Sequence, residues 1–264
     1  MKGAFFVNKT GGFYWVDLMS TDAAGAREFY EKVLEWSPQD ITTPDGSTYM
    51  MLTHEGDLVA GLGEHSAAMK AQGVPSMWNS YVTVDDVAAS VDAARNLGAT
   101  IMLEPRTIEG AGTMAHIVDP VGAAISLWQP DGHDGGEKFN TPNSLTWNEL
   151  MTRDPVTAAE FYIALFGWSF EEVEDSEPPY TTILNGPNMN GGLLDATTLL
   201  PDGAPSMWGV YFAVADTDAT VDAAVAGGGR VIHGPVDMPG VGRTAVIADP
   251  QGAVFSVIRS EQPG

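Results

Sequence analysis

The chain has 264 residues and 44% of them are hydrophobic, enough for one large domain or two ordinary ones with a buried core. Acidic residues outnumber basic ones by 35 to 12, and the net charge of −23 argues against binding to nucleic acid or to a membrane surface. Because the chain has no cysteine, no recognisable signal peptide and no apolar run long enough to cross a bilayer, we expect a cytoplasmic protein without disulfides or thiolate sites.

The N-terminal half of the chain reads as alternating strands and helices. A β-rich run at 13–19 (FYWVDLM) leads to Asp22, a residue type that caps helices, and then to a helical pattern at 23–36. The remaining predicted elements are a hairpin at 48–62 turned at Glu55-Gly56-Asp57, a strand at 80–84, a helix at 86–98, and strands at 113–119 and 123–129.

The same phrases return in the C-terminal half. Trp15, Asp22 and Tyr30 recur 132 positions later (147 − 15) as Trp147, Asp154 and Tyr162, and the pattern DP.GA..S recurs near the end of each half. The elements predicted there are a strand at 145–151, helices at 155–168 and 217–229, a hairpin at 180–194, and strands at 210–214, 244–250 and 253–259. Since the segment 131–142 is rich in Gly, Asp and Pro, we predict modules at 1–130 and 143–264 joined by this linker.

The shared motifs resemble the vicinal oxygen chelate superfamily, the glyoxalase, bleomycin-resistance and dioxygenase group. They are STDAAGAREFYEKVLEW and TRDPVTAAEFYIALFGW, which open each half, and VDPVGAAISLW and ADPQGAVFSVI, which close it. The resemblance implies an α+β fold of two tandem glyoxalase-like modules, each made of paired βαβββ units that curl a mixed sheet around a cavity. Pockets in this superfamily pair within one chain or across a homodimer, and both arrangements stay open here.

In metal-using members of the superfamily, the resemblance implies ligands at three strand positions of each module. These positions hold Trp15, Asn79 and Ser126 in the first module, and Trp147, Gly209 and Ser256 in the second. None of these is a usual metal ligand, so we expect neither a metal nor another cofactor. A tryptophan at this point suits an apolar wall or a stacking platform for a ligand.

Strand alternation predicts the lining of each cavity. Val82, Val210 and Phe212 should face the helices, which leaves the alternate side chains of the same strands for the opposite face. The residues predicted to contact a ligand are Trp15, Asn79, Ser126, Trp128, Trp147 and Ser256. The candidates for acid–base chemistry are Asp17, Glu149, Tyr81 and Tyr211. Trp78 and Trp208, which precede two of these strands, are interpreted as packing residues.

The five histidines do not recur between the halves, so we interpret them as structural or solvent-facing residues. Neither Ser126 nor Ser256 has a repeat-matched histidine nearby, and no Ser-His-Asp arrangement is predicted.

The pattern therefore predicts a metal-independent protein that binds a hydrophobic or aromatic small molecule, either to sequester it or to act on it by acid–base chemistry. One alternative is a metal-dependent lyase or dioxygenase with atypical ligands such as Asp17, His116 or Glu149. Another is a structural module whose sheets have no open cavity. Metal analysis of the purified protein discriminates the first alternative.

Overall fold

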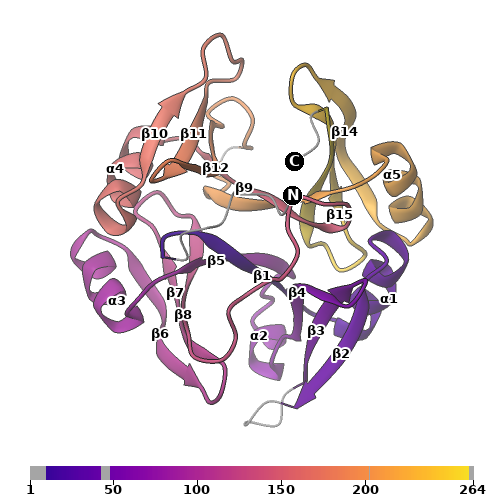
Figure 1. Ribbon diagram of the computed structural model, residues 1–264, viewed down its shortest axis with the longest axis horizontal. Helices are drawn as coiled ribbons and strands as arrows, with labels where there is room; N and C mark the ends of the chain where they lie inside the picture. The colour runs from indigo at the N-terminus through magenta and orange to yellow at the C-terminus, as the bar shows by residue number, and fades with distance from the viewer. Residues whose placement is uncertain (1–9, 43–47, 202, 262–264) are drawn as a thin grey trace. The chain divides into compact units, whose positions relative to one another are not determined.

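The computed structural model describes residues 10–42, 48–201 and 203–261 (Figure 1). Most of the N-terminal segment that bears on the cytoplasmic expectation lies outside these ranges. Within them, no helix combines the length and the apolar character that crossing a membrane requires.

Two eight-stranded mixed sheets form the framework, one from each repeat. Both are open and have equivalent strand orders, β2-β3-β4-β1-β5-β8-β7-β6 and β10-β11-β12-β9-β13-β16-β15-β14. The N-terminal repeat contains β1 (Phe13–Ser20), α1 (Ala23–Val33), β2 (Ser37–Thr42), β3 (Thr48–His54), β4 (Asp57–Glu64), α2 (Ala67–Ala71), β5 (Met77–Thr83), α3 (Val87–Asn96), β6 (Thr100–Ile108), β7 (Gly112–Val118) and β8 (Ala124–Pro130). The C-terminal repeat contains β9 (Ser144–Thr152), α4 (Pro155–Phe166), β10 (Ser169–Glu172), β11 (Tyr180–Asn185), β12 (Asn188–Asp195), β13 (Met207–Ala213), α5 (Thr217–Ala226), β14 (Arg230–Met238), β15 (Gly242–Ala248) and β16 (Val254–Ser260).

Four helices, α1, α3, α4 and α5, begin directly after an aspartate. The side chains of Asp22 and Asp154 accept hydrogen bonds from backbone N–H groups in the first turns of α1 and α4, and α4 adds a proline at its start. The two helices end differently, because Gly167 takes the left-handed conformation after α4 (φ 71°) whereas Glu35 takes it after α1 (φ 56°). Glycine adopts this conformation at little cost, and glutamate does not.

The chain forms two compact units, and each unit combines half of each repeat. Unit 1 comprises residues 1–14, 80–135 and 147–209, and unit 2 comprises residues 15–79, 136–146 and 210–264. Helix α3 packs against α4 in unit 1, and α1 packs against α5 in unit 2 (Figure 1). Each repeat therefore contributes one βαβββ half to each hydrophobic core.

In unit 2, the repeated motifs meet in a buried aromatic cluster. Tyr30 of α1 donates its hydroxyl hydrogen to Asp249 Oδ2 (3.1 Å) and accepts a hydrogen bond from Trp78 Nε1 (3.0 Å). The ring of Trp36 stacks on Tyr30 and its Nε1 donates to the carbonyl of Asn143 (2.8 Å). The "FY", "SMW" and "DP.G" motifs are thus parts of one core that joins the two repeats.

Unit 1 contains the same cluster with the roles of the repeats exchanged. Tyr162 donates to Asp119 Oδ2 (2.8 Å) and accepts from Trp208 Nε1 (2.8 Å), while Trp168 donates to the carbonyl of Gly11 (2.8 Å). Burial raises the pKa of Asp119, against the hydrogen bonds from Tyr162 and from backbone N–H groups. The packing role predicted for Trp208, and for its counterpart in unit 2, is confirmed.

The predicted helices, both predicted hairpins and the closing strands are present. The sequence pattern did not predict four strands, β2, β6, β10 and β14, or the short helix α2. These four strands lie at the outer edges of the sheets. Three of them, β2, β6 and β14, contain a proline, and β10 is largely exposed and has only four residues. Edge strands tolerate proline and need no buried face, so their sequences carry a weak strand signal.

Candidate functional site

A buried carboxylate on β1 is the centre of the first candidate site, in unit 2. Asp17 is 4% exposed and lies on the face of β1 opposite Val16 and Leu18, which belong to the core beneath the helices. Tyr49 Oη donates to Asp17 Oδ2 (3.1 Å), and Asn79 Nδ2 donates to Asp17 Oδ1 (2.8 Å). Each carboxylate oxygen is therefore held by a different strand, which fixes the orientation of the group.

Trp15 completes this network, which we call the Asp17 network (Trp15, Asp17, Tyr49 and Asn79). Its Nε1 donates to Tyr49 Oη (3.3 Å), and the indole itself is 5% exposed. Trp15 and Asp17 thus share one strand face, as the two-residue spacing predicted.

Gly61 on β4 makes room for the tyrosine. A Cβ atom added to Gly61 would lie 1.9 Å from Tyr49 Oη and 3.0 Å from Asp17 Cβ, so any larger residue would displace the tyrosine hydroxyl. Strand β4 pairs with β1 at this point, with Gly61 opposite Asp17. The network requires this glycine, because any side chain at this position of β4 would occupy the space of the Tyr49 hydroxyl.

The phenol of Tyr49 is a donor and not a base. Burial raises its pKa well above the ordinary value, and the neighbouring Asp17 raises it further. The hydroxyl therefore keeps its proton at neutral pH and orients the carboxylate. Asp17 is the group of this network that can accept a proton from a ligand.

The C-terminal repeat retains the aromatic part of the arrangement and changes its polar part. In unit 1, Trp147 Nε1 donates to Tyr180 Oη (2.8 Å), and a Cβ atom on Gly192 would lie 1.8 Å from that oxygen. Glu149, 8% exposed, takes the place of Asp17. Gly209 stands where the first repeat has Asn79, so the amide that holds Asp17 has no equivalent here.

Tyr49 and Tyr180 were not among the predicted site residues. Both belong to predicted hairpins, and each hydroxyl lies against a glycine of the returning strand, Gly61 for Tyr49 and Gly192 for Tyr180. The signal that could have found them is the tyrosine that opens each hairpin, combined with the recurring glycine on the returning strand.

A second polar pair lies in unit 1, on strands β7 and β8. His116 and Ser126 are cross-strand partners, and His116 Nδ1 lies 2.7 Å from Ser126 Oγ. No sequence pattern predicted this contact, because His116 does not recur in the second repeat; the histidine beside Ser126 is not a repeat-matched one. The ring of Tyr81 lies 6.0 Å from His116 and 6.5 Å from Trp128, and Trp128 Nε1 donates to the carbonyl of His133 (2.9 Å).

The second repeat has no such pair. Val246 occupies the position of His116 opposite Ser256, and Tyr211 is paired with Ser256 on the neighbouring strand. Ser256 is 6% exposed, whereas Tyr211 is partly exposed. The predicted polar residues of the two repeats therefore have different surroundings.

The side chains at the superfamily's three metal-ligand positions do not suit a metal. Indole offers one N–H donor and no ligand atom, and the Asn79 amide is hydrogen-bonded to Asp17. Within residues 10–42, 48–201 and 203–261, no three His, Asp or Glu side chains gather closely enough to hold a metal ion. Metal independence nonetheless stays a prediction, and its test is given below.

Comparison with known proteins places the chain among relatives of one kind. The Glyoxalase/Bleomycin resistance protein/Dioxygenase superfamily model matches residues 12–127 and again 144–257. The chain is 41% identical over 247 residues to a Mycobacterium tuberculosis protein named "Putative glyoxylase CFP32", covering 93% of each chain. It is 32% identical over 256 residues to "Anthracycline biosynthesis protein DauV" of Streptomyces sp. (strain C5), covering 92% of this chain and 91% of the relative.

Solved structures agree with this fold. The Mn(II)-bound glyoxalase from Novosphingobium aromaticivorans has a TM-score of 0.62 and 14% sequence identity, over 97% of this chain and 86% of that one. At this identity the likeness concerns the fold alone.

Proposed function

Since this chain belongs to the glyoxalase/bleomycin resistance protein/dioxygenase superfamily, we propose that it binds a hydrophobic or aromatic small molecule at the Asp17 network without using a metal. The superfamily hosts unrelated chemistries on one fold, so the proposal rests on the site. The first candidate function is sequestration of this ligand.

The observation that carries the proposal is the held carboxylate of Asp17 beside two aromatic side chains. Burying a charged group costs free energy unless hydrogen bonds compensate, and here Tyr49 and Asn79 supply them. Aromatic surface with a few oriented polar groups is the usual composition of a small-molecule site. Trp15 supplies the surface, and Asp17 supplies an acceptor for a hydroxyl or amine hydrogen of the ligand.

The N-terminal repeat is the better candidate for binding. Asn79, which holds the Asp17 carboxylate, becomes Gly209 in the second repeat, so the polar group that orients the carboxylate is replaced there by a residue without a side chain. The remaining predicted contacts, Tyr81, Ser126, Trp128, Trp147, Tyr211 and Ser256, stay predictions, as does the role of Glu149.

Acid–base catalysis is the second candidate, favoured by the same geometry. Asp17 would take a proton from a carbon or oxygen acid, while Tyr49 and Asn79 act as positioning residues that stabilise the carboxylate. The names of the two relatives, a glyoxylase and an anthracycline biosynthesis protein, are compatible with chemistry on a small molecule. An aromatic natural product is therefore the first class of ligand to try.

The first test is to identify what the protein holds. Native mass spectrometry of the freshly purified protein should show a co-purifying organic molecule, and elemental analysis should show less than about 0.1 metal ion per chain. A stoichiometric, tightly held Mn, Fe, Ni or Zn would contradict metal independence and support the metal-dependent alternative.

The second test separates binding from catalysis. With an anthracycline as the probe, we expect Trp15→Ala and Asp17→Asn to weaken binding by about tenfold each, which corresponds to about 1.4 kcal/mol. Glu149→Gln, the matched change in the second repeat, should leave the affinity unchanged. Retained affinity with lost turnover in Asp17→Asn would identify an enzyme, and unchanged behaviour of both Trp15→Ala and Asp17→Asn would refute the site.

A further inference from the structure

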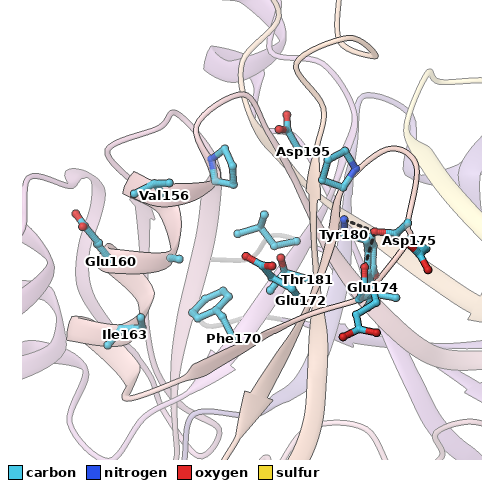
Figure 2. A pocket seen from close by; sticks show the side chains of 16 residues that line it. Val156, Glu160, Ile163, Phe170, Glu172, Glu174, Asp175, Tyr180, Thr181 and Asp195 are labelled. Atoms are coloured by element: carbon cyan, nitrogen blue, oxygen red, sulfur yellow. Dashed lines mark hydrogen bonds between the residues drawn. The ribbon is translucent and has the colours of Figure 1, made fainter.

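A groove lies on unit 1, between helix α4 and the β10–β11 hairpin (Figure 2). Its volume is about 560 Å³, within the range of pockets that take drug-sized molecules. Its wall includes the helix face turned away from the core, because α4 buries Ala158, Phe161 and Tyr162 against the sheet instead. The groove is therefore separate from the Asp17 network, which belongs to unit 2.

The helix side of the groove is apolar. Val156 is 66% exposed and Ile163 is 49% exposed, with Ala159 between them on the same face. Phe170 of β10 forms the floor of the groove, between α4 and the strand side (Figure 2), and packs against the core. Exposed aliphatic side chains beside a concave surface mark a place where a ligand can bury apolar area.

Five carboxylates line the groove, one from helix α4 and four from the strand side and the rim. Glu160, Glu172, Glu174, Asp175 and Asp195 all line the groove, and no lysine, arginine or histidine does so in the described part of the chain. None of the five carboxylates takes part in a salt bridge among the described residues. Carboxylates without a cationic partner, around an apolar floor, give the groove a negative potential that favours a cation.

Hydrogen bonds hold the rim in place. Ser176 Oγ accepts from the backbone N–H of Tyr180 and donates to the carbonyl of Val173, both at 2.9 Å. The N–H of Val173 donates to the carbonyl of Tyr180 (3.0 Å). Because its own hydrogen bonds already hold the rim, the rim loses little conformational entropy when a ligand binds, which favours affinity.

The equivalent surface of the N-terminal repeat is different. Arg27 and Glu31 stand where α4 has Ala159 and Ile163, and they form an i,i+4 salt bridge (3.1 Å) on the exposed face of α1. Pro38 stands in place of Phe170. The exposed face of α1 thus carries charged side chains at positions where α4 is apolar.

We infer that this groove binds a hydrophobic organic cation, an amine or ammonium group on an apolar or aromatic body. The apolar body would lie on Val156, Ile163 and Phe170, and the cationic group would lie among the carboxylates of Glu172 and Glu174. The charge of the groove excludes the corresponding acids, and its apolar floor favours such a molecule over a small inorganic cation.

The test uses the full chain and the probe dansylcadaverine, a primary amine on a naphthalene ring, with its N-acetylated form as the neutral counterpart. Calorimetry should show the amine binding at least about tenfold more tightly than the acetylated probe, with an affinity that falls as salt is added. In methyl NMR spectra, the signals of Val156 and Ile163 should shift on binding.

The double variant Glu172→Gln/Glu174→Gln should weaken the amine at least about fivefold. Asp40→Asn/Asp57→Asn removes the same charge from two exposed residues of the first repeat and should leave the affinity unchanged. Val156→Ser/Ile163→Ser should weaken both probes, since it removes only apolar contact.

Equal affinity for the two probes, an equal loss in both acid-to-amide double variants, or methyl shifts confined to residues outside the groove would each overturn the inference. All the substituted residues are exposed, so the variants should fold, and circular dichroism checks this. Because Asp17 is untouched throughout, the result is independent of the function proposed above.

Discussion

Tyr30 and Tyr162 occupy equivalent positions in the two repeats and make the same hydrogen bonds. Each donates to an aspartate of the other repeat, Asp249 or Asp119, and each accepts from a tryptophan. Outside these cores the two repeats differ. The N-terminal repeat has Asn79 and His116 at its candidate sites, and the C-terminal repeat has an apolar groove along α4.

The contrast separates two kinds of constraint on one fold. A buried hydrogen-bonded cluster can change little, because each lost partner leaves a buried polar group unsatisfied. A side chain on the open face of a sheet or on the outer face of a helix meets no such restriction. The repeats are therefore alike where each needs the other to fold, and different at the candidate sites and on the exposed face of the first helix of each repeat.

The largest expected effect concerns the shared aspartates. Asp119→Ala and Asp249→Ala should each lower the free energy of unfolding by about 3–5 kcal/mol, because two backbone N–H groups and a tyrosine hydroxyl lose their acceptor. Urea denaturation measures this. Asp131→Ala, at an exposed position, should change the value by less than about 0.5 kcal/mol. A loss below about 1 kcal/mol in either core variant would break the equivalence of the two clusters.

The paired glycines come next. Gly61→Ala and Gly192→Ala should each destabilise the protein by about 1–3 kcal/mol, because the new methyl group would overlap with Tyr49 or Tyr180. Gly209→Ala is the control, since its nearest neighbour is an ordinary contact at 3.8 Å. Only Gly61→Ala should also abolish binding at the Asp17 network. Loss of binding in Gly192→Ala alone would move the functional site to the second repeat.

The pH dependence tests the buried carboxyls. Burial raises the pKa of Asp249, so the folded protein holds that proton more tightly than the unfolded chain does. Its stabilising contribution is full below the unfolded pKa of about 4 and is lost as pH rises through the folded pKa. Relative to the parent, the non-titrating Asp249→Asn should therefore become less destabilising between about pH 4 and pH 7.

The contribution of Asp154 to stability depends on pH in the opposite direction. Hydrogen bonds from Thr157 lower its pKa, so its contribution is present above the unfolded pKa and is lost as pH falls through the folded pKa. The deficit of Asp154→Asn should therefore stay constant above about pH 4, where that of Asp249→Asn shrinks, and should become smaller as pH falls below about 4. Unfolding curves at several pH values check both, and a common slope would contradict the assignment.

The smallest effect concerns the helix ends. Glu35→Gly should stabilise the protein by up to about 1 kcal/mol and Gly167→Ala should destabilise it by about 1 kcal/mol, because both positions have a left-handed backbone. Thermal unfolding resolves the two shifts. Shifts of the same sign would mean that the contact of Glu35 with His54, at 3.8 Å, matters more than the backbone conformation.

The resemblance of the repeated motifs to a known superfamily implied the fold class. The sequence by itself determined the repeat, the starts of α1 and α4 and the two-residue spacing that puts Trp15 and Asp17 on one strand face. These follow from local periodicity, capping residues and internal similarity, which need no knowledge of distant contacts. The edge strands were not predicted, because a strand without a buried face shows no alternation of hydrophobic and polar residues.

Only the tertiary structure decided which residues meet. Tyr49 reaches Asp17 because β4 offers a glycine between them, and His116 reaches Ser126 because of the register of one hairpin. The hydrogen bond of Tyr30 to Asp249 joins residues 219 positions apart, one in each repeat, and so each compact unit contains segments of both repeats. Register and long-range packing depend on the whole chain at once, and so the candidate sites appear only when the sheets are formed.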